Sequence, residues 1–191
     1  EKIEIYDSDL SGVEASLDGV KFKLGEREFA SPLLGKFNAA NLAVCVKTAL
    51  YLGLDEARIA SALSRLKNVE HRLERIDAGG KIIIDDGFNG NFNGMSASYE
   101  LVASYEGRKV LVTPGIMESS DEENEKLSKI INKTFDIVML TSSLNAVALL
   151  KHLSRPKVIV IKDKSKMQEA LAQNTKAGDL ILFSNDAPSF M

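Results

Sequence analysis

The second half of the chain alternates regularly between helical and strand patterns, and this alternation constrains the fold more than any other feature. Segments with helical spacing lie near 95–104, 121–132, 145–154 and 165–174, and each precedes a short apolar run, in order KVLVT (109–113), DIVML (136–140), KVIVI (157–161) and DLILF (179–183). Such apolar strands are buried on both faces of a sheet, and the helices between them provide crossover connections. We therefore predict an α/β fold with a doubly wound, mostly parallel, Rossmann-like sheet. Two of the helices are predicted to open with capping boxes, Ser120 with Glu123 and Ser165 with Gln168.

Residues 1–68 show a different pattern. Asp18-Gly19 lies between two short alternating runs and predicts the turn of a β-hairpin. Apolar residues at helical spacing then predict one helix ending near Gly53 and a second that Asp55 caps at its N-terminus. Because so few elements make a thin core, we expect residues 1–68 to be the α+β tail of a larger domain and residues 69–191 to be a separate domain.

Just after this boundary, the runs RLERID (72–77) and KIIIDD (81–86) flank Ala78-Gly79-Gly80. Glycine pairs between strand patterns favour tight turns, so the two runs predict a hairpin. Its first strand is expected to be an antiparallel edge of the parallel sheet.

Composition excludes several classes of protein. The net charge is −3 and the basic residues are scattered, which gives no case for a nucleic-acid partner. No apolar run approaches the roughly 20 residues of a membrane span, and the first residues are acidic. We therefore expect a cytoplasmic protein with neither a signal peptide nor a membrane anchor. The single cysteine, Cys45, excludes an internal disulfide, and its apolar helical surroundings predict a buried thiol.

The loop DDGFNGNFNG (85–94) is the first candidate for a binding site, because ligands of open α/β sheets bind beyond the carboxyl ends of the strands. Its glycines allow close approach of the backbone, and a helix N-terminus offers free N–H donors. Asparagine amides donate and accept, and a carboxylate at a strand end can accept hydrogen bonds from sugar hydroxyls. A solvated turn is the alternative, but the position at the first strand end favours a binding loop.

Asn38 and Asn41 form a second candidate, at the start of a long apolar helix. Two amides three residues apart could read the edge of a nucleobase. Taken alone, the pattern favours helix capping by one of the two, because asparagine is a preferred N-cap residue.

Arg72 is a third candidate, since the guanidinium fork suits phosphate, although a lone arginine at a strand start is usually a surface residue. His71 and His152 have no cysteine or acidic partner at metal-ligand spacing, so we expect both to be structural or solvated and expect no metal site. The chain also has no G-x-x-x-x-G-K-[ST] phosphate loop and no G-x-G-x-x-G fingerprint.

Taken in order, four segments resemble the Mur ligase family. GKFNAAN (35–41), with a helix that ends at Leu52-Gly53, is similar to the family's Gly-x-His-Asn-x-x-Asn segment. Arg72 and DDGFNGN (85–91) are similar to an arginine followed by an Asp-Asp-Ser-Tyr-Asn-Ala-Asn loop. TPGIME (113–118) and the ending ILFSNDAP resemble segments of the family branch that adds D-alanyl-D-alanine. The resemblance covers nearly the whole chain.

The resemblance implies an ATP-dependent amide ligase of peptidoglycan precursor synthesis, acting as a monomer on ATP, UDP-N-acetylmuramoyl-tripeptide and D-alanyl-D-alanine. In this family the precursor carboxylate is phosphorylated to an acyl phosphate, which the dipeptide amine attacks. Residues 1–68 would be the end of the central ATP-binding domain and 69–191 the C-terminal domain. The phosphate loop and the Mg²⁺ ligands would lie upstream, so we expect the 191-residue chain alone to be inactive.

The same resemblance assigns site residues but no catalytic residue within this chain. Asn38 and Asn41 would lie at the adenine, Arg72 at the ATP phosphates or ribose, and Asp86 at the ribose hydroxyls. The residues near ATP and the incoming dipeptide would be Phe88, Asn89 and Asn91.

The chain departs from the family pattern in two regions of the site and in one later segment. Phe37 replaces a histidine, Gly87 a serine and Phe88 a tyrosine or lysine. Glu118-Ser119-Ser120 replaces the usual Glu-Leu-Gly. The missing hydroxyl at position 88 removes any hydrogen bond that a tyrosine would make there.

Two other classes of protein with a doubly wound sheet lack their defining residues in this sequence. A phosphoacceptor receiver needs an aspartate after the third parallel strand and a lysine after the fifth, where this chain has Thr141-Ser142 and Ser184-Asn185. A nucleotide-dependent oxidoreductase needs the glycine fingerprint that is absent. Another Mur ligase, a folylpolyglutamate-type ligase, and a domain that only binds nucleotide or peptide remain as alternatives.

Overall fold

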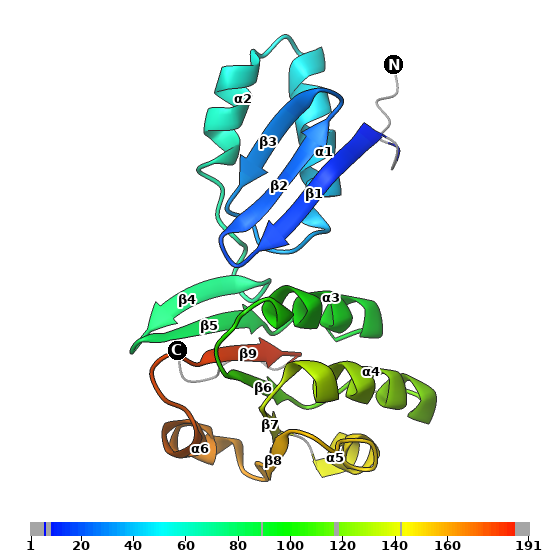
Figure 1. Ribbon diagram of the computed structural model, residues 1–191, viewed down its shortest axis with the longest axis vertical. Helices are drawn as coiled ribbons and strands as arrows, with labels where there is room; N and C mark the ends of the chain where they lie inside the picture. Colours follow the sequence, from blue (N-terminus) through cyan, green and yellow to red (C-terminus); the bar gives the residue numbers. More distant parts are fainter. Residues whose placement is uncertain (1–5, 7–8, 89, 117–118, 142, 186–191) are drawn as a thin grey trace. The chain divides into compact units, whose positions relative to one another are not determined.

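The computed structural model describes residue 6 and residues 9–88, 90–116, 119–141 and 143–185. The chain folds into two compact units, Glu1–Asn68 and Val69–Met191 (Figure 1). That the first unit is the tail of a central ATP-binding domain stays a prediction.

The first unit is a three-stranded antiparallel sheet with two helices. The strands are β1 (Leu10–Ser16), β2 (Gly19–Leu24) and β3 (Arg27–Ser31), and the helices are α1 (Asn38–Tyr51) and α2 (Glu56–Leu63). The predicted hairpin at Asp18-Gly19 is confirmed, since Ser16 pairs with Gly19. Phe22 and Phe29 pair directly across β2 and β3 and stack in the core beneath the helices.

Two expectations about α1 are wrong. Its N-cap residue is Phe37, which makes no side-chain capping bond, so neither asparagine caps the helix. A tight turn before the helix already uses the first amides, because Asn38 N donates to the Gly35 carbonyl and Ala39 N to the Lys36 carbonyl. Cys45 is exposed rather than buried. The apolar residues of α1 extend around more of the helix than the face that packs on this sheet.

The second unit is a six-stranded sheet in the order β4-β5-β9-β6-β7-β8. All neighbouring strands are parallel except β4 and β5, which form the predicted hairpin with β4 at the edge. The predicted fold class is therefore confirmed. The bounds of the strands are β4 Glu74–Ala78, β5 Lys81–Asp86, β6 Lys109–Thr113, β7 Ile137–Leu140, β8 Lys157–Val160 and β9 Leu180–Ser184.

The helices of this unit are α3 (Phe92–Ala103), α4 (Asp121–Thr134), α5 (Ser143–Leu150) and α6 (Met167–Asn174), with a short 3-10 helix, η2 (Lys164–Lys166), before α6. The chain moves across the sheet in one direction from β5 to β8 and then returns to β9 through α6. Because crossovers between parallel strands are right-handed, helices on the outward path lie on one face and the returning helix on the other. This path accounts for the two helical layers around the sheet (Figure 1).

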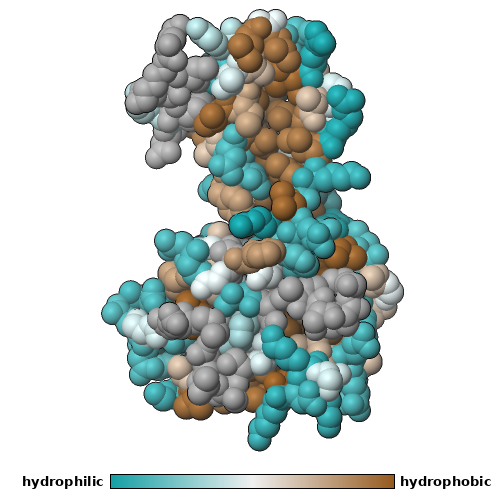
Figure 2. Space-filling view, turned by 180° about the vertical axis from the view of Figure 1, so that it is seen from behind, coloured by the Kyte–Doolittle hydropathy of each residue, from teal (hydrophilic) through white to brown (hydrophobic). Residues whose placement is uncertain are grey.

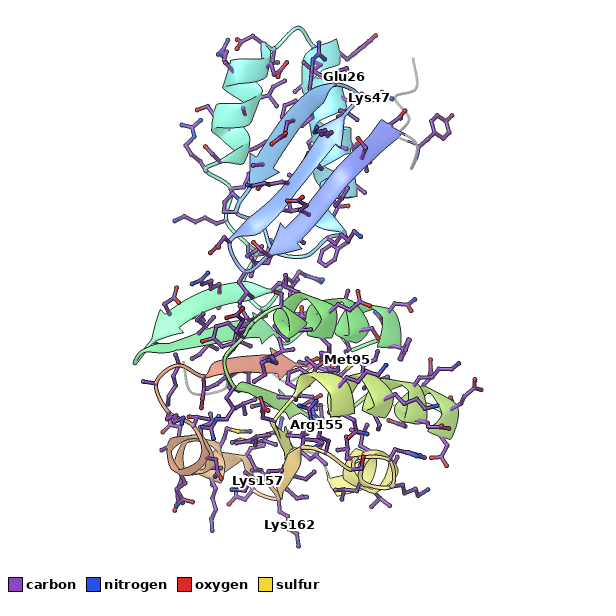
Figure 3. The ribbon with its side chains drawn as sticks, in the orientation of Figure 1. Glu26, Lys47, Met95, Arg155, Lys157 and Lys162 are labelled. Carbon is purple, nitrogen blue, oxygen red and sulfur yellow. The ribbon has the colours of Figure 1, made fainter. Side chains whose placement is uncertain are left out.

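The cores on the two faces follow the strand alternation. Val110, Val112 and Phe183 pack with Met167 and Leu171 of α6 on one face. The alternate strand residues point to the opposite face, where α3 contacts β9 and α4 contacts α3 and α5. Met95 of α3 is fully buried and lies between α3 and the sheet (Figure 3).

Of the two predicted capping boxes, one helix start is confirmed. Ser120 caps α4 by accepting a hydrogen bond from Glu123 N at 3.2 Å. The prediction that Ser165 caps the last helix with Gln168 is wrong, because Ser165 lies inside η2. Asp163 caps η2 by accepting from Ser165 N at 3.0 Å, and Lys166, the N-cap residue of α6, makes no side-chain capping bond. Within the described ranges, no helix has the length and apolar character needed to cross a membrane.

Candidate functional site

Three loops meet at the carboxyl ends of β5, β9 and β6, which are neighbours in the sheet. Asn185 joins them: its backbone N–H donates to the Asp86 carbonyl at 3.2 Å, and its Nδ2 donates to the Gly115 carbonyl at 2.9 Å. A Cβ added at Gly90 would lie 2.6 Å from Asn185 Oδ1, so the loop after β5 passes closely over this side chain. Gly90, Gly115 and Asn185 thus lie where the three loops approach one another.

Asp86 ends β5 and is 3% exposed. Hydroxyl groups of Tyr99, Thr113 and Ser184, all fully buried, lie around this strand end. Burial raises the pKa of the Tyr99 phenol, the nearby Ser184 and Thr113 hydroxyls oppose the shift, and the Asp86 charge adds to it. Neither hydroxyl completes a hydrogen bond of standard geometry with the phenol among the described residues. The phenol therefore stays neutral beside a buried carboxylate at neutral pH.

A second cluster joins residues on either side of the β4–β5 hairpin with Asp85 at the end of β5. Asp85 is 1% exposed; its Oδ2 lies 2.7 Å from His71 Nδ1, and its Oδ1 accepts from Gly87 N at 3.0 Å. The Phe88 ring lies against the imidazole, with centroids 5.6 Å apart, and the Arg72 guanidinium carbon lies 5.6 Å from the Phe88 centroid. The loop thus presents a cation over an aromatic ring that is 67% exposed.

The structure brings Arg72 and Phe88 together in the second unit, and Asp86 ends the strand two residues before Phe88. Asn91 begins α3, and its Oδ1 caps the helix by accepting from Gly94 N at 2.9 Å. This bond gives Asn91 a structural role, and a contact with substrate stays a prediction. Asn89 lies outside the described residues.

Asn38 and Asn41 lie in the first unit and form a pair. Asn38 Nδ2 donates to the Leu34 carbonyl at 2.7 Å, and Asn41 Nδ2 donates to Asn38 Oδ1 at 3.2 Å. The Leu34 N–H donates in turn to Asn68 Oδ1 at 3.1 Å, so both amides are held in a small network. The convergence of this pair with Arg72 and Asp86 on one nucleoside stays a prediction.

The hollow in the first unit does not coincide with the candidate residues. A hollow of about 440 Å³ lies between the β1–β2 hairpin and Ser64 in the first unit and includes none of the candidate side chains. In the part of the chain that the structure describes, no three histidine, cysteine, aspartate or glutamate residues gather as metal ligands would.

Comparison with known proteins decides the family. The model of the family described as "Mur ligase, glutamate ligase domain" matches residues 71–185. This chain belongs to the Mur ligase family. The match covers the second unit almost completely, including the loops that carry Arg72, Asp86 and Phe88.

Among curated Mur ligases, the UDP-N-acetylmuramoyl-tripeptide–D-alanyl-D-alanine ligase of Bacillus subtilis is 32% identical over 189 residues, which cover 93% of this chain and 41% of that protein. The ligase of the same name from Escherichia coli is 28% identical over 117 residues, covering 59% of this chain and 26% of that protein. The chain therefore spans less than half the length of these relatives.

Solved Mur ligase structures share the fold. The D-alanyl-D-alanyl ligase of Acinetobacter baumannii superposes with a TM-score of 0.78 at 22% identity, over 93% of this chain and 40% of that one. The MurF ligase of Thermotoga maritima, solved in complex with ADP, gives a TM-score of 0.74 at 23% identity, over 93% of this chain and 42% of that one.

The sequence pattern alone assigns no partner to His71 or Asp85, although a signal for their proximity exists. The tight turn at Gly79-Gly80 fixes the pairing of β4 with β5, in which Glu74 lies opposite Asp85. Continued outward by three residues, the same register sets His71 opposite Phe88, and Phe88 N indeed donates to the His71 carbonyl at 3.3 Å.

Proposed function

We propose that this chain is the C-terminal part of an ATP-dependent ligase that adds D-alanyl-D-alanine to UDP-N-acetylmuramoyl-tripeptide during peptidoglycan precursor synthesis. The observation that carries the proposal is the similarity to the Bacillus subtilis ligase of that name, which extends over 93% of the chain. The segment Thr113–Ile116, which resembles the same branch, supports it. Such a ligase acts as a monomer. It acts in the cytoplasm, where its nucleotide-linked substrates are made.

In this proposal the first unit is the end of the central ATP-binding domain and contributes Asn38 and Asn41 to the adenine. The second unit contributes Arg72 to the phosphates or ribose and Asp86 to the ribose hydroxyls. Their chemistry fits a nucleotide: a guanidinium fork for anionic oxygens and a strand-end carboxylate to accept from hydroxyl donors. Phe88, Asn89 and Asn91 lie near ATP and the incoming dipeptide.

The reaction joins two steps. A carboxylate oxygen of the tripeptide precursor attacks the γ-phosphorus of ATP, the bond to ADP breaks, and an acyl phosphate forms. The amine of D-alanyl-D-alanine then attacks the acyl carbon, inorganic phosphate leaves, and the amine gives up its proton. The share of this chain is to position the nucleotide and to offset the negative charge of both intermediates.

In this proposal the ligase also binds Mg²⁺, and the residues that would hold it lie in the upstream part of the ligase.

The test is a ligase assay on the full-length protein with ATP, UDP-N-acetylmuramoyl-tripeptide and D-alanyl-D-alanine. We expect ADP release that requires both substrates, and a raised KM for ATP in Asp86→Ala. The matched control is Asp77→Ala, which removes an exposed carboxylate from the neighbouring strand β4. Ligation of single amino acids in preference to the dipeptide would assign the chain to another branch, such as the folylpolyglutamate-type ligases that share the fold at a TM-score of 0.66.

The isolated 191-residue chain is expected to turn over no ATP, because its sequence has no phosphate loop. ATP hydrolysis by the purified chain that disappears in Asp86→Ala would contradict this expectation. Binding of nucleotide without turnover would agree with it.

A further inference from the structure

Arg72 lies between two residues with unusual backbone geometry. His71 and Leu73 have φ angles of 61° and 52°, in the left-handed region that residues with a Cβ rarely adopt. Each such residue costs about 1–2 kcal/mol, so surrounding contacts must stabilise the turn. Leu73 is held by burial in the core, with 2% of its surface exposed. His71 has 29% of its side chain exposed and needs a different restraint.

Asp85 supplies that restraint. Its carboxylate is buried, and both of its oxygens are held: one accepts from Gly87 N and the other lies 2.7 Å from His71 Nδ1. The His71 ring in turn contacts the Phe88 ring, and the His71 carbonyl accepts from Phe88 N. The imidazole is thereby fixed on one side by a carboxylate and on the other by an aromatic ring.

We propose that His71 and Asp85 are positioning residues, which lock the turn 71–73 so that the Arg72 guanidinium is held over Phe88 to receive a phosphate group. Arg72 sits 5.6 Å from the Phe88 centroid, a distance typical of a cation–π contact. That the phosphate belongs to ATP rests on the proposed function. The positioning itself rests only on the contacts within the second unit.

The lock depends on the charge of the imidazole. The hydrogen bond with Asp85 raises the pKa of His71, partial burial opposes the shift, and the charges of Asp85, Glu70 and Glu74 add to it. Glu70 Oε1 lies 3.6 Å from His71 Nε2, and Arg72 is the adjacent cation. With a raised pKa, the ion pair is complete below the ordinary value of 6.5 and is lost as pH rises through the folded value. The hold on Arg72 therefore weakens toward alkaline pH, when only a neutral hydrogen bond remains.

Three variants separate charge from shape. His71→Asn keeps an N–H donor where Nδ1 stands and tolerates the left-handed backbone, but it does not titrate. His71→Asp has the same shape and backbone tolerance but repels Asp85. Asp85→Asn keeps an acceptor for Gly87 N and removes the charge that faces His71. This last variant does not depend on whether His71→Asp folds.

The first experiment uses NMR on the 191-residue chain without nucleotide. The chain has two histidines, and His152→Gln identifies the signal of His71. In the wild type, we expect the Phe88 ring and Arg72 Nε–H signals to shift with the same midpoint as His71. His71→Asn should give pH-independent signals near the position that the wild type reaches at alkaline pH. His71→Asp should give displaced signals, and Asp85→Asn a lower midpoint. Arg72 and Phe88 signals that match the wild type in all three variants would overturn the proposal.

The second experiment measures the KM for ATP of the full-length ligase. We expect His71→Asp to raise KM about tenfold with kcat nearly unchanged, the scale of one hydrogen bond to a charged group. His71→Asn should give a KM that is nearly independent of pH and close to the wild-type value at alkaline pH. A wild-type KM in His71→Asp would overturn the role in binding. A wild-type enzyme without ligase activity would refute the proposed function instead, and the NMR experiment would still decide the positioning.

Discussion

The ion pair of Arg108 with the buried Asp179 joins the starts of β6 and β9. Asp179 is 1% exposed and accepts from Arg108 Nε at 3.0 Å, from Arg108 Nη2 at 2.6 Å and from Lys176 N at 2.8 Å. Burial alone would raise the pKa of Asp179, but these hydrogen bonds more than offset burial and hold it below 3.8. The carboxylate therefore stabilises the fold above that pH, and the contribution is lost as pH falls through the lowered pKa.

We predict that Asp179→Asn lowers the free energy of unfolding by about 2 kcal/mol at pH 7, less than for a fully buried pair because the Arg108 side chain is 35% exposed. Urea denaturation followed by circular dichroism measures the loss. The matched control, Asp77→Asn, removes the charge of an exposed pair with Arg75 and should cost less than about 0.5 kcal/mol. The difference in unfolding free energy between the wild type and Asp179→Asn should shrink as the pH falls below the lowered pKa of Asp179. A difference that stays constant would contradict the assignment to this charge.

Single residues show where sequence patterns stop being informative. Asp55 and Ser120 cap helices as predicted, because each directly precedes a strong helical run. Asn38 and Ser165 do not, since a preceding turn or 3-10 helix already uses the first free amides. The bond between His71 and Asp85 joins residues 14 apart in sequence and follows only from the hairpin register.

At the scale of elements, the β1–β2 hairpin depends on Gly19. Its φ is 132°, and a Cβ there would lie 2.1 Å from the Ser31 carbonyl oxygen of β3. We predict that Gly19→Ala destabilises the first unit by about 3 kcal/mol, because both the backbone angle and the neighbouring strand resist a side chain. Gly25→Ala, in the next turn at φ 61° with open space around it, should cost only about 1 kcal/mol. Thermal unfolding compares the two, and equal losses would contradict the steric argument.

The elements of the second unit could be predicted because buried strands give apolar runs and helices give a period of 3.6 residues. The strand order could not. β8 and β9 are similar apolar runs, yet β8 lies at an edge and β9 in the middle of the sheet. What distinguishes them is the return path through α6, which depends on the handedness of crossovers and on packing against both faces rather than on the strands' own sequences.

At the scale of the whole molecule, one face of the first unit is unusually apolar. Val44 and Tyr51 of α1 and Leu52, its C-cap residue, are exposed, and Cys45 lies exposed beside Val44. Figure 2 shows apolar side chains gathered over this unit. Soluble domains rarely leave such a helix stripe open to water, because burying each large side chain is worth about 1.5–3 kcal/mol. The stripe supports the proposal that this unit completes a larger ATP-binding domain, as in relatives more than twice as long.

Cys45 provides a test of this proposal. In the folded 191-residue chain, a maleimide reagent should label Cys45 about as fast as in urea, because the thiol is exposed. In the full-length ligase, the upstream part of the domain should cover α1 and slow labelling by at least about tenfold, measured by mass spectrometry over time. Slow labelling of the short chain would contradict the exposure of α1. Equal rates in the short and full-length proteins would show that the stripe stays open, and the first unit would then be a domain of its own rather than the end of one.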